Sequence, residues 1–377
     1  MPVLIPTLVF RPVSTQLLVT DGVRSVGENI RDALRTHQDT KTLGCHVHEP
    51  IRPYWPEDAA AQSDRIFTGR YNGRRFALNV TGGTTLMALG ARRAAAEHNV
   101  PLLYVDTDNG VIITLAPDGS VTGEREITVS VPTSTYLAAH SATVSAREPW
   151  GKAIERRESW LKPFLEAATV LGQAGGGSER LLDVIRPVCS GGAAGPAELP
   201  EVTTAEESLA NRLQEFGMIE VARRGGSLQV QPKGDERIRQ FLTGHWLELY
   251  VYRACLTSGL FDDVCLSVDI RRRTESGTVV NECDVLTTLR GRLAVISCKT
   301  ARLDHKDENK GAVYELDSLL QAELMGLYAR KVLVTNRLAL RPPLRNRAGL
   351  SQIECIWGPH LPDVAQRIQS CLLPGRR

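Results

Sequence analysis

The chain has 377 residues, a length typical of two or three domains and sufficient to bury a large core. Its 45 Lys and Arg residues nearly balance its 43 Asp and Glu residues. This balance excludes a polybasic nucleic-acid coat and a long acidic tail, but it leaves room for a local basic groove. There is no run of about 18 apolar residues, so we expect no membrane-spanning helix. The eight cysteines are scattered without a CxxC pair, which favours reduced thiols and a cytoplasmic location.

The first 140 residues alternate between patterns typical of strands and of helices. We expect strands at residues 16–19, 75–80, 101–105 and 111–115, and helices at residues 25–36 and 86–97. Strands that alternate with helices favour an α/β domain built on a largely parallel sheet.

The composition changes near residue 150. A helix is expected at residues 151–171, and residues 172–177 and 190–200 have the Gly, Ala and Pro content of linkers. Short helices at residues 181–185 and 206–216 and a small β-wing at residues 228–231 complete this region. The pattern predicts a winged-helix-like module.

The third region begins near Asp235. The elements expected in it are a helix at 237–255 interrupted by Gly244, strands at 278–287, 293–300 and 331–334, a tight turn at Arg290-Gly291, and a helix at 312–328. Together they predict a second α/β domain.

A strand, a glycine turn and a helix start follow one another at Thr81-Gly82-Gly83-Thr84-Thr85. Glycines permit a positive φ and a close approach of a ligand to the backbone. The helix N-terminus offers unpaired N–H groups and a partial positive charge, and either of the last two threonines can cap it. The turn is a candidate phosphate-binding site, and a plain capped turn is the alternative interpretation.

Polar side chains follow the predicted strands of the third region. Glu282 and Asp284 share one face of their strand, and Ser297 and Lys299 share one face of the next. If residues 290–291 form a two-residue loop, Asp284 lies opposite Ser297 and Glu282 lies opposite Lys299. We therefore expect these four side chains to converge.

Two interpretations of this convergence stay open. The lysine lies in an apolar strand, where it needs a partner, so a structural Glu282–Lys299 ion pair is one interpretation. The other is a metal-dependent phosphodiesterase, in which Asp284 holds Mg²⁺ or Mn²⁺ and Lys299 orients the attacking water and stabilises charge on the phosphate. Glu248, on the preceding helix, would add a ligand or orient one. The arginines at 271–273 either contact a nucleic-acid backbone or form a solvated charged run.

Taken together, a helix glutamate, a strand aspartate and a lysine on the next strand resemble the core of the PD-(D/E)xK nucleases. Residues 244–248, 281–286, 296–300 and 314–317 carry this resemblance. Residues 79–87 resemble part of a CARF domain, the Rossmann-like sensor of CRISPR systems. In this order the motifs resemble the type III CRISPR ancillary nucleases, which join a CARF sensor to a PD-(D/E)xK effector.

The resemblance implies three regions: a CARF-like sensor of a cyclic oligonucleotide at residues 1–140, a linker with a winged-helix-like insert at 141–234, and a restriction-endonuclease-like α/β nuclease domain at 235–377. It implies a symmetric homodimer that binds a cyclic oligoadenylate, with cyclic tetra-adenylate expected. It also implies that this activator switches on cleavage of DNA or RNA with Mg²⁺ or Mn²⁺, away from any membrane.

The resemblance also assigns residues. The residues expected to bind the activator are Thr81, Gly82, Gly83, Thr84, Thr85 and Met87. The residues expected in catalysis are Asp284, Lys299, Glu282, Glu248 and Ser297, and the expected metal ligands among them are Asp284, Glu282 and Glu248.

Two features depart from the family pattern. Ser297 occupies the position of the family's second acidic residue, so another carboxylate or a backbone carbonyl substitutes for it, or the activity is weak. The chain also opens close to the first helix of a CARF-like domain, so we expect that the first strand of that domain lies upstream of Met1.

Two alternative functions stay open on these residues. One is a catalytically weak or inactive cyclic-nucleotide sensor whose middle module binds DNA or a partner, which Ser297 favours. The other is a constitutive, metal-dependent restriction-type nuclease, in which the turn at residues 81–85 is structural.

Overall fold

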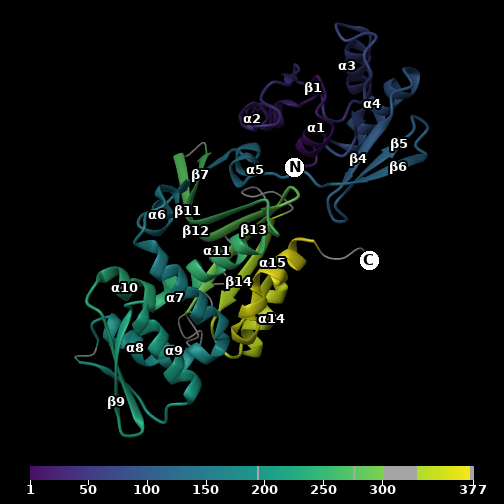
Figure 1. The fold of residues 1–377 in the computed structure, drawn as a ribbon. Coiled ribbons are helices and arrows are strands. Elements are labelled where there is room, and N and C mark those ends of the chain that lie inside the picture. The colour runs from purple at the N-terminus through teal and green to yellow at the C-terminus, as the bar shows by residue number, and fades with distance from the viewer. Residues whose placement is uncertain (193–194, 275–276, 301–328, 374–377) are drawn as a thin grey trace.

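The computed structural model describes residues 1–192, 195–274, 277–300 and 329–373. Within these ranges the protein is a mixed α/β protein with four sheets, of two, three, four and six strands. Figure 1 shows the N-terminal elements gathered in one body and the remaining elements in a larger one. The expected helix at residues 312–328 and the motif residues 314–317 lie outside the described residues.

The N-terminal body carries helices and strands close to the expected positions. Its helices are α1 (Leu4–Phe10), α2 (Arg24–Thr36), α3 (Pro56–Thr68) and α4 (Thr85–Glu97). Its strands are β1 (Ser14–Leu17), β2 (Gly44–Val47), β3 (Leu78–Asn79), β4 (Leu102–Asp106), β5 (Val111–Leu115) and β6 (Val121–Glu126). Apolar residues at helical spacing explain α2, which buries Ile30, Ala33 and Leu34.

The prediction of a largely parallel sheet is wrong for this body. Strands β3 and β4 pair in parallel, and so do β1 and β2 in a separate sheet, but β4, β5 and β6 run antiparallel. The cause is the tight turn after β4. There Asp106 accepts hydrogen bonds from the backbone and side chain of Asn109, and Gly110 has a φ of +69°. Such a turn returns the chain directly beside the strand it has left.

A helix and a strand connect the two bodies. They are α5 (Thr133–Ala139) and β7 (Ala142–Ala146), which lie beside each other in Figure 1. Strand β7 pairs with the C-terminal sheet. The backbone N–H groups of Val131 and Thr133, just before and at the start of α5, donate to the carboxylates of Asp262 and Asp263.

The single helix expected at residues 151–171 is wrong, because the chain forms α6 (Trp150–Arg156) and α7 (Leu161–Gln173). Arg157, with a φ of +53°, ends α6 in the left-handed conformation. The linker expected at residues 172–177 is also wrong. Gly172, Gly175 and Gly176 are buried, and the absence of a side chain lets the helix end pack closely on its neighbours.

The next elements contain the two short helices and the small wing that the sequence predicts. The elements are α8 (Glu179–Cys189), β8 (Ala197–Leu199), α9 (Thr204–Glu215), β9 (Ile219–Arg224) and β10 (Ser227–Pro232). Strand β8 lies within the stretch expected to be a linker and pairs with β10, so the sheet order is β8-β10-β9. A capping box between Thr203 and Glu206 starts α9.

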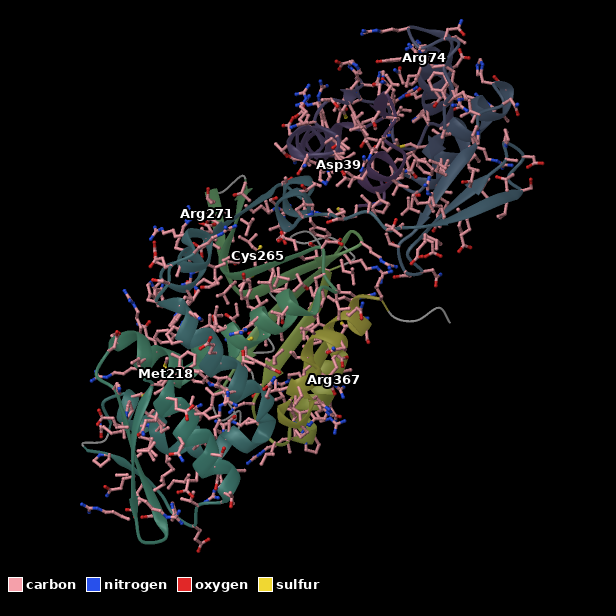
Figure 2. All side chains as sticks on the ribbon, viewed as in Figure 1. Asp39, Arg74, Met218, Cys265, Arg271 and Arg367 are labelled. Carbon is pink, nitrogen blue, oxygen red and sulfur yellow. The ribbon has the colours of Figure 1, made fainter. Side chains whose placement is uncertain are left out.

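The C-terminal part is built on a six-stranded sheet in the order β15-β14-β13-β12-β11-β7. Its strands are β11 (Asp263–Thr274), β12 (Gly277–Leu289), β13 (Arg292–Lys299), β14 (Ala329–Thr335) and β15 (Ile353–Ile356). Its helices are α10 (Glu236–Gln240), α11 (Trp246–Ser258), α14 (Pro342–Leu350) and α15 (Val364–Leu372). Figure 2 labels Cys265 near the start of β11 and Arg271 toward its opposite end.

Both faces of this sheet are covered, except along the outer parts of β11 and β12, where residues such as Arg271 and Val280 are exposed. On one face α7, α11 and α15 pack through residues such as Ala168, Leu249 and Ile368. On the other face α1, α2 and α5 of the N-terminal part pack against the sheet through residues such as Leu8 and Leu34. The sheet is therefore the structural centre to which the other parts attach.

No helix within the described ranges is long and apolar enough to cross a membrane. All eight cysteines carry free thiols, as their scattered positions predict.

The buried glycine turn yields a stability prediction. A Cβ on Gly172 would lie 2.2 Å from Cδ2 of Tyr250, whose hydroxyl is fixed by a 2.8 Å hydrogen bond to the Leu361 carbonyl. We expect Gly172→Ala to lower the free energy of unfolding by about 1–3 kcal/mol, measured by urea denaturation. Gly177→Ala is the matched control, because its Cβ would have no neighbour within 4 Å, and we expect it to change stability by less than about 0.5 kcal/mol. Equal effects of the two substitutions would contradict this packing argument.

Candidate active site

The loop between β12 and β13 fixes the register on which the site depends. Arg290 and Gly291 both have positive φ, +52° and +77°, as a two-residue hairpin loop requires, and Leu289 pairs with Arg292. The expected register is therefore confirmed from the loop to the pair Val285–Ile296.

Beyond that pair the strands separate, and the side chain of Asp284 fills the space between them. Its Oδ2 accepts a 2.7 Å hydrogen bond from the backbone N–H of Cys298, and the Ser297 hydroxyl donates to the same oxygen at 3.4 Å. Asp284 and Ser297 thus come together as the sequence predicts. The bond to the backbone orients the carboxylate and replaces one rung of the ladder.

Glu248 projects from α11 into the same region. Burial and the neighbouring negative charge of Asp284 raise the pKa of Glu248 to about 8, while the positive charges of Lys299 and Arg147 act in the opposite direction. The charge of Glu282 raises it further. All five groups therefore belong to one electrostatic site.

The helix that carries Glu248 begins with a π-helical segment, Phe241–His245, which the sequence marks only by Gly244. Such segments are frequent at functional sites. The Thr300 hydroxyl donates to the Thr243 carbonyl at 2.8 Å, and His245 stacks on the buried ring of Trp150. Burial lowers the pKa of His245, and the negative charge of the nearby Asp284 opposes this shift.

Arg147 is a site residue that the sequence patterns do not indicate. This residue directly follows β7, and its guanidinium pairs with Glu282 at 2.7 Å and with Asp269 at 3.2 Å. No local motif identifies it, because only the pairing of β7 with β11 brings it to the site. The structure therefore places an arginine beside the Glu282 carboxylate, in addition to the expected Lys299.

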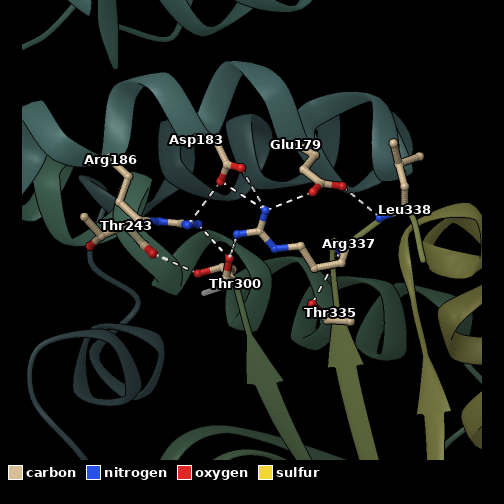
Figure 3. Close-up of polar contacts among 8 residues, drawn as sticks. All are labelled: Glu179, Asp183, Arg186, Thr243, Thr300, Thr335, Arg337 and Leu338. Carbon is tan, nitrogen blue, oxygen red and sulfur yellow. Dashed lines mark hydrogen bonds and ion pairs between the residues drawn. The ribbon is translucent and has the colours of Figure 1, made fainter. Parts of the chain in front are cut away.

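Thr300, the residue that directly follows the end of β13, is held by a buried polar network (Figure 3). Arg186 of α8 and Arg337, after β14, each donate to the Thr300 carbonyl at 2.7 Å. Arg337 also pairs with Glu179 and Asp183 of α8, both at 3.0 Å. Helix α8 is thus tied to the strand end that presents the lysine.

The structure brings only part of the expected metal-ligand set together. Within the described residues no group of three or more Asp, Glu, His or Cys side chains is arranged to hold a metal ion. Asp284 and Glu248 share the site, while the Glu282 carboxylate is 66% exposed and paired with Arg147. Two carboxylates fit the way Mg²⁺ is usually held, because waters and substrate phosphates complete its octahedral shell.

The turn at residues 81–85 has the geometry expected of a capped helix start. Gly83 has a φ of +84°, and the Thr84 hydroxyl accepts from the Met87 N–H and donates to the Pro53 carbonyl. The Thr81 hydroxyl donates to Asn79 and accepts from the N–H of Val105, which fixes the turn to β4.

These contacts divide the expected binding residues of the turn into two groups. Gly83 and Thr85 are exposed, whereas the Met87 side chain is buried against Ala59 and Ala91. The turn is therefore open to solvent at Gly83 and Thr85.

Residues 235–371 match the family model of the Card1-like endonuclease domain. Over these residues the chain is similar to the Card1-like endonuclease domain. The matched range starts where the third region was expected, and it contains Glu248, Asp284 and Lys299.

Solved structures share the fold of nearly the whole chain. Protein VC1899 from Vibrio cholerae matches with a TM-score of 0.72 at 20% identity, covering 99% of this chain and 96% of that one. Can2 from Sulfobacillus thermosulfidooxidans, solved in complex with cyclic tetra-adenylate, matches with a TM-score of 0.71 at 20% identity, covering 98% and 93%. No curated protein sequence matches the chain.

A type III CRISPR defence DNA nuclease activated by cyclic oligoadenylate also matches, with a TM-score of 0.51 at 18% identity. The match covers 89% of this chain and 43% of that protein. The resemblance to CRISPR-associated nucleases is therefore confirmed for the fold and for the endonuclease domain.

The raised pKa of Glu248 predicts a dependence of stability on pH. Its ordinary value is 4.5, so between that pH and about 8 the folded protein keeps a proton that the unfolded chain releases. The contribution of Glu248 to stability therefore falls as the pH rises through this range. We expect Glu248→Gln to gain stability relative to the unsubstituted protein between pH 5 and pH 9, measured by urea denaturation in EDTA. Glu215→Gln, at an exposed end of α9, should leave the difference constant, and a constant difference for Glu248→Gln would contradict the assignment.

Proposed function

We propose that this protein is a metal-dependent nuclease, activated by cyclic tetra-adenylate, that cleaves DNA or RNA in type III CRISPR antiviral defence. The observation that carries the proposal is the joint site of Asp284, Glu248 and Lys299 within the endonuclease domain. Two neighbouring carboxylates, one of them (Glu248) with a raised pKa, beside a lysine are an unfavourable arrangement for stability alone, and a frequent one at catalytic sites.

The chemistry of the proposed site follows from its charges. Asp284 and Glu248 would hold a Mg²⁺ or Mn²⁺ ion, which supplies neutralisation of phosphate charge and activation of water when bound. The backbone N–H of Cys298 keeps the Asp284 carboxylate oriented. Lys299 would orient the attacking water and stabilise the negative charge that develops on the phosphate. Glu282 would serve as a further ligand after release from Arg147.

The proposed activator site is the turn at residues 81–85 in a homodimer. A two-fold axis presents the same turn twice, which suits a ring of four identical nucleotides. The exposed Gly83 and Thr85 at the N-terminus of α4 offer backbone N–H groups and a hydroxyl to phosphates. Can2, whose fold this chain shares, was solved with cyclic tetra-adenylate bound. In this proposal residues 1–140 are the sensor, 141–234 the linking module and 235–377 the nuclease.

One observation favours a second function, that of a sensor with weak or no catalysis. Ser297 stands where the nuclease pattern has an acidic residue, and its hydroxyl is directed to Asp284. A neutral hydroxyl is a poorer ligand for a hard cation than a carboxylate. Activity in the absence of the activator would instead favour a constitutive nuclease.

Cleavage of nucleic acid tests the proposed function. We expect supercoiled plasmid or single-stranded RNA to be cleaved with Mn²⁺ and cyclic tetra-adenylate, and expect EDTA or omission of the activator to abolish cleavage. Asp284→Ala and Lys299→Ala should each lower the cleavage rate at least about 100-fold, because each removes a group that acts in the transition state. Arg223→Ala, on the exposed wing, is the charge-matched control and should cleave normally.

The outcomes separate the three functions. Cleavage that requires the activator and disappears in both variants supports the proposal. Cleavage without the activator would establish the constitutive nuclease. Binding of cyclic tetra-adenylate without cleavage under any condition would establish the sensor.

Ser297 yields a gain-of-function prediction. We expect Ser297→Glu to increase cleavage at low Mn²⁺ concentration, because the new carboxylate lies beside Asp284 and adds an oxygen ligand. Ser297→Ala should leave the metal dependence unchanged, because the hydroxyl contact to Asp284 is long. A titration of initial rate against Mn²⁺ measures both. An unchanged or weaker metal dependence in Ser297→Glu would show that position 297 does not face the ion.

A further inference from the structure

Arg147 is anchored to the sheet at its backbone. Its N–H donates to the Ser267 carbonyl at 2.8 Å, and Ser267 has a φ of +45°, an unusual conformation for serine. Gly151, one turn later, approaches the same carbonyl so closely that a Cβ there would lie 2.3 Å from its oxygen. Strained backbone conformations of this kind cluster at functional sites.

Ser267 also changes which side of the sheet β11 presents. Leu266 belongs to the core under α11, whereas Val268, two residues later, belongs to the core on the opposite face. Residues two apart in a regular strand share a face, so the left-handed Ser267 accounts for the switch. Beyond it, Asp269 and Arg271 point to the face of α11 and the active site.

The partner strand continues this surface. Asp269 pairs in register with Glu282, and Arg271 pairs with Val280, which is 47% exposed. The guanidinium of Arg271 lies 3.5 Å from the Asp269 carboxylate, and Figure 2 shows this arginine near the outer end of the strand. Arg147 and Arg271 therefore follow one another along an accessible face that starts at the catalytic carboxylates.

The pairs of these arginines differ in exposure. Arg147 is about one third exposed and Arg271 more than half exposed, while Glu282 is 66% exposed and Asp269 is 20% exposed. The more exposed Arg147–Glu282 pair is of the kind that contributes little to stability. A phosphodiester backbone offers guanidinium groups stronger, charge-assisted partners.

We propose that Arg147 and Arg271 bind the phosphodiester backbone of the substrate strand and guide it to Asp284, with Asp269 and Glu282 holding the two arginines until substrate arrives. This inference rests on the proposed nuclease function and names the path of its substrate. Arg147 pairs with Glu282 at 2.7 Å, and Glu282 lies two residues before Asp284 in β12, so a phosphate bound to Arg147 would lie close to the proposed catalytic groups.

The position of Arg147 in the chain adds a consequence for activation. It directly follows β7, and β7 follows α5, which packs against α2 of the N-terminal body. A change in that body reaches Arg147 through one helix and one strand. The experiment is therefore run with and without cyclic tetra-adenylate.

Equilibrium binding in EDTA tests the proposal independently of cleavage. Fluorescein-labelled single-stranded DNA and RNA of ~20 nucleotides serve as probes. Their binding is followed by fluorescence anisotropy at several NaCl concentrations. The variants are Arg147→Ala, Arg147→Lys, Arg271→Ala and the distant control Arg223→Ala. The two nucleic acids distinguish which backbone is preferred.

We expect Arg147→Ala and Arg271→Ala each to weaken binding roughly 5- to 10-fold at low salt. Each should also reduce the slope of log affinity against log salt by about 0.7, the value for one lost phosphate contact on a single strand. Arg147→Lys should keep most of the slope. Glu282→Gln should tighten binding, because it removes the carboxylate that competes for Arg147.

Binding and slope in Arg147→Ala equal to those of Arg223→Ala would overturn the proposal, as would undetectable binding by the unsubstituted protein. If Arg147→Ala fails to fold, the binding of Glu282→Gln and Arg271→Ala decides instead. A purely structural Arg147–Glu282 ion pair predicts that Glu282→Gln binds no more tightly than the unsubstituted protein, and that result would overturn the proposal. Normal cleavage by Arg147→Ala with unchanged binding would reject this path while leaving the proposed function intact. Arginine-dependent binding without any cleavage would support this path and reject the proposed nuclease function.

Discussion

The structure depends on how strand β13 ends. The carbonyl of Thr300 accepts from Arg186 and Arg337, and its hydroxyl donates to the π-helical segment before α11. One residue therefore joins the linking module, the end of β14 and the helix that carries Glu248. Because Lys299 directly precedes this junction, any shift of α8 is transmitted to the strand end that presents the lysine. The ion pairs that join Arg337 to Glu179 and Asp183 of α8 are costly to break, because the buried guanidinium would lose its carboxylate partners.

The site next to this junction is short of positive charge. Asp284 and Glu248 disfavour each other's ionised forms, and the chain offers Lys299 and Arg147 as partial compensation. Folding alone would be better served by neutral residues. A bound cation would supply the missing compensation. The same imbalance that costs stability thus prepares the site for its proposed chemistry.

The sequence predicts the central hairpin well because the information is local. A two-residue loop with Gly291 determines the register, and alternation then brings Asp284 to Ser297. It predicts the N-terminal sheet poorly because β6 is exposed along its whole length and lacks apolar alternation. It mistakes buried glycines for a linker, since composition does not reveal that Gly172 packs on Tyr250. Arg147 lies outside local inference altogether, because only the long-range pairing of β7 brings it to the site.

The left-handed Ser267 explains why regular strand alternation does not predict which face carries the site residues of β11. Regular alternation would place the residues beyond it on the wrong face of the sheet. The switch places Asp269 and Arg271 on the same side as the carboxylates instead. It also clarifies the meaning of Ser297. An acidic residue there would add a fifth carboxylate to a face that already carries Asp269, Glu282, Asp284 and Glu248. With a neutral serine, the two arginines and Lys299 come closer to balancing the charge, which favours the approach of an anionic strand over tight retention of a metal ion.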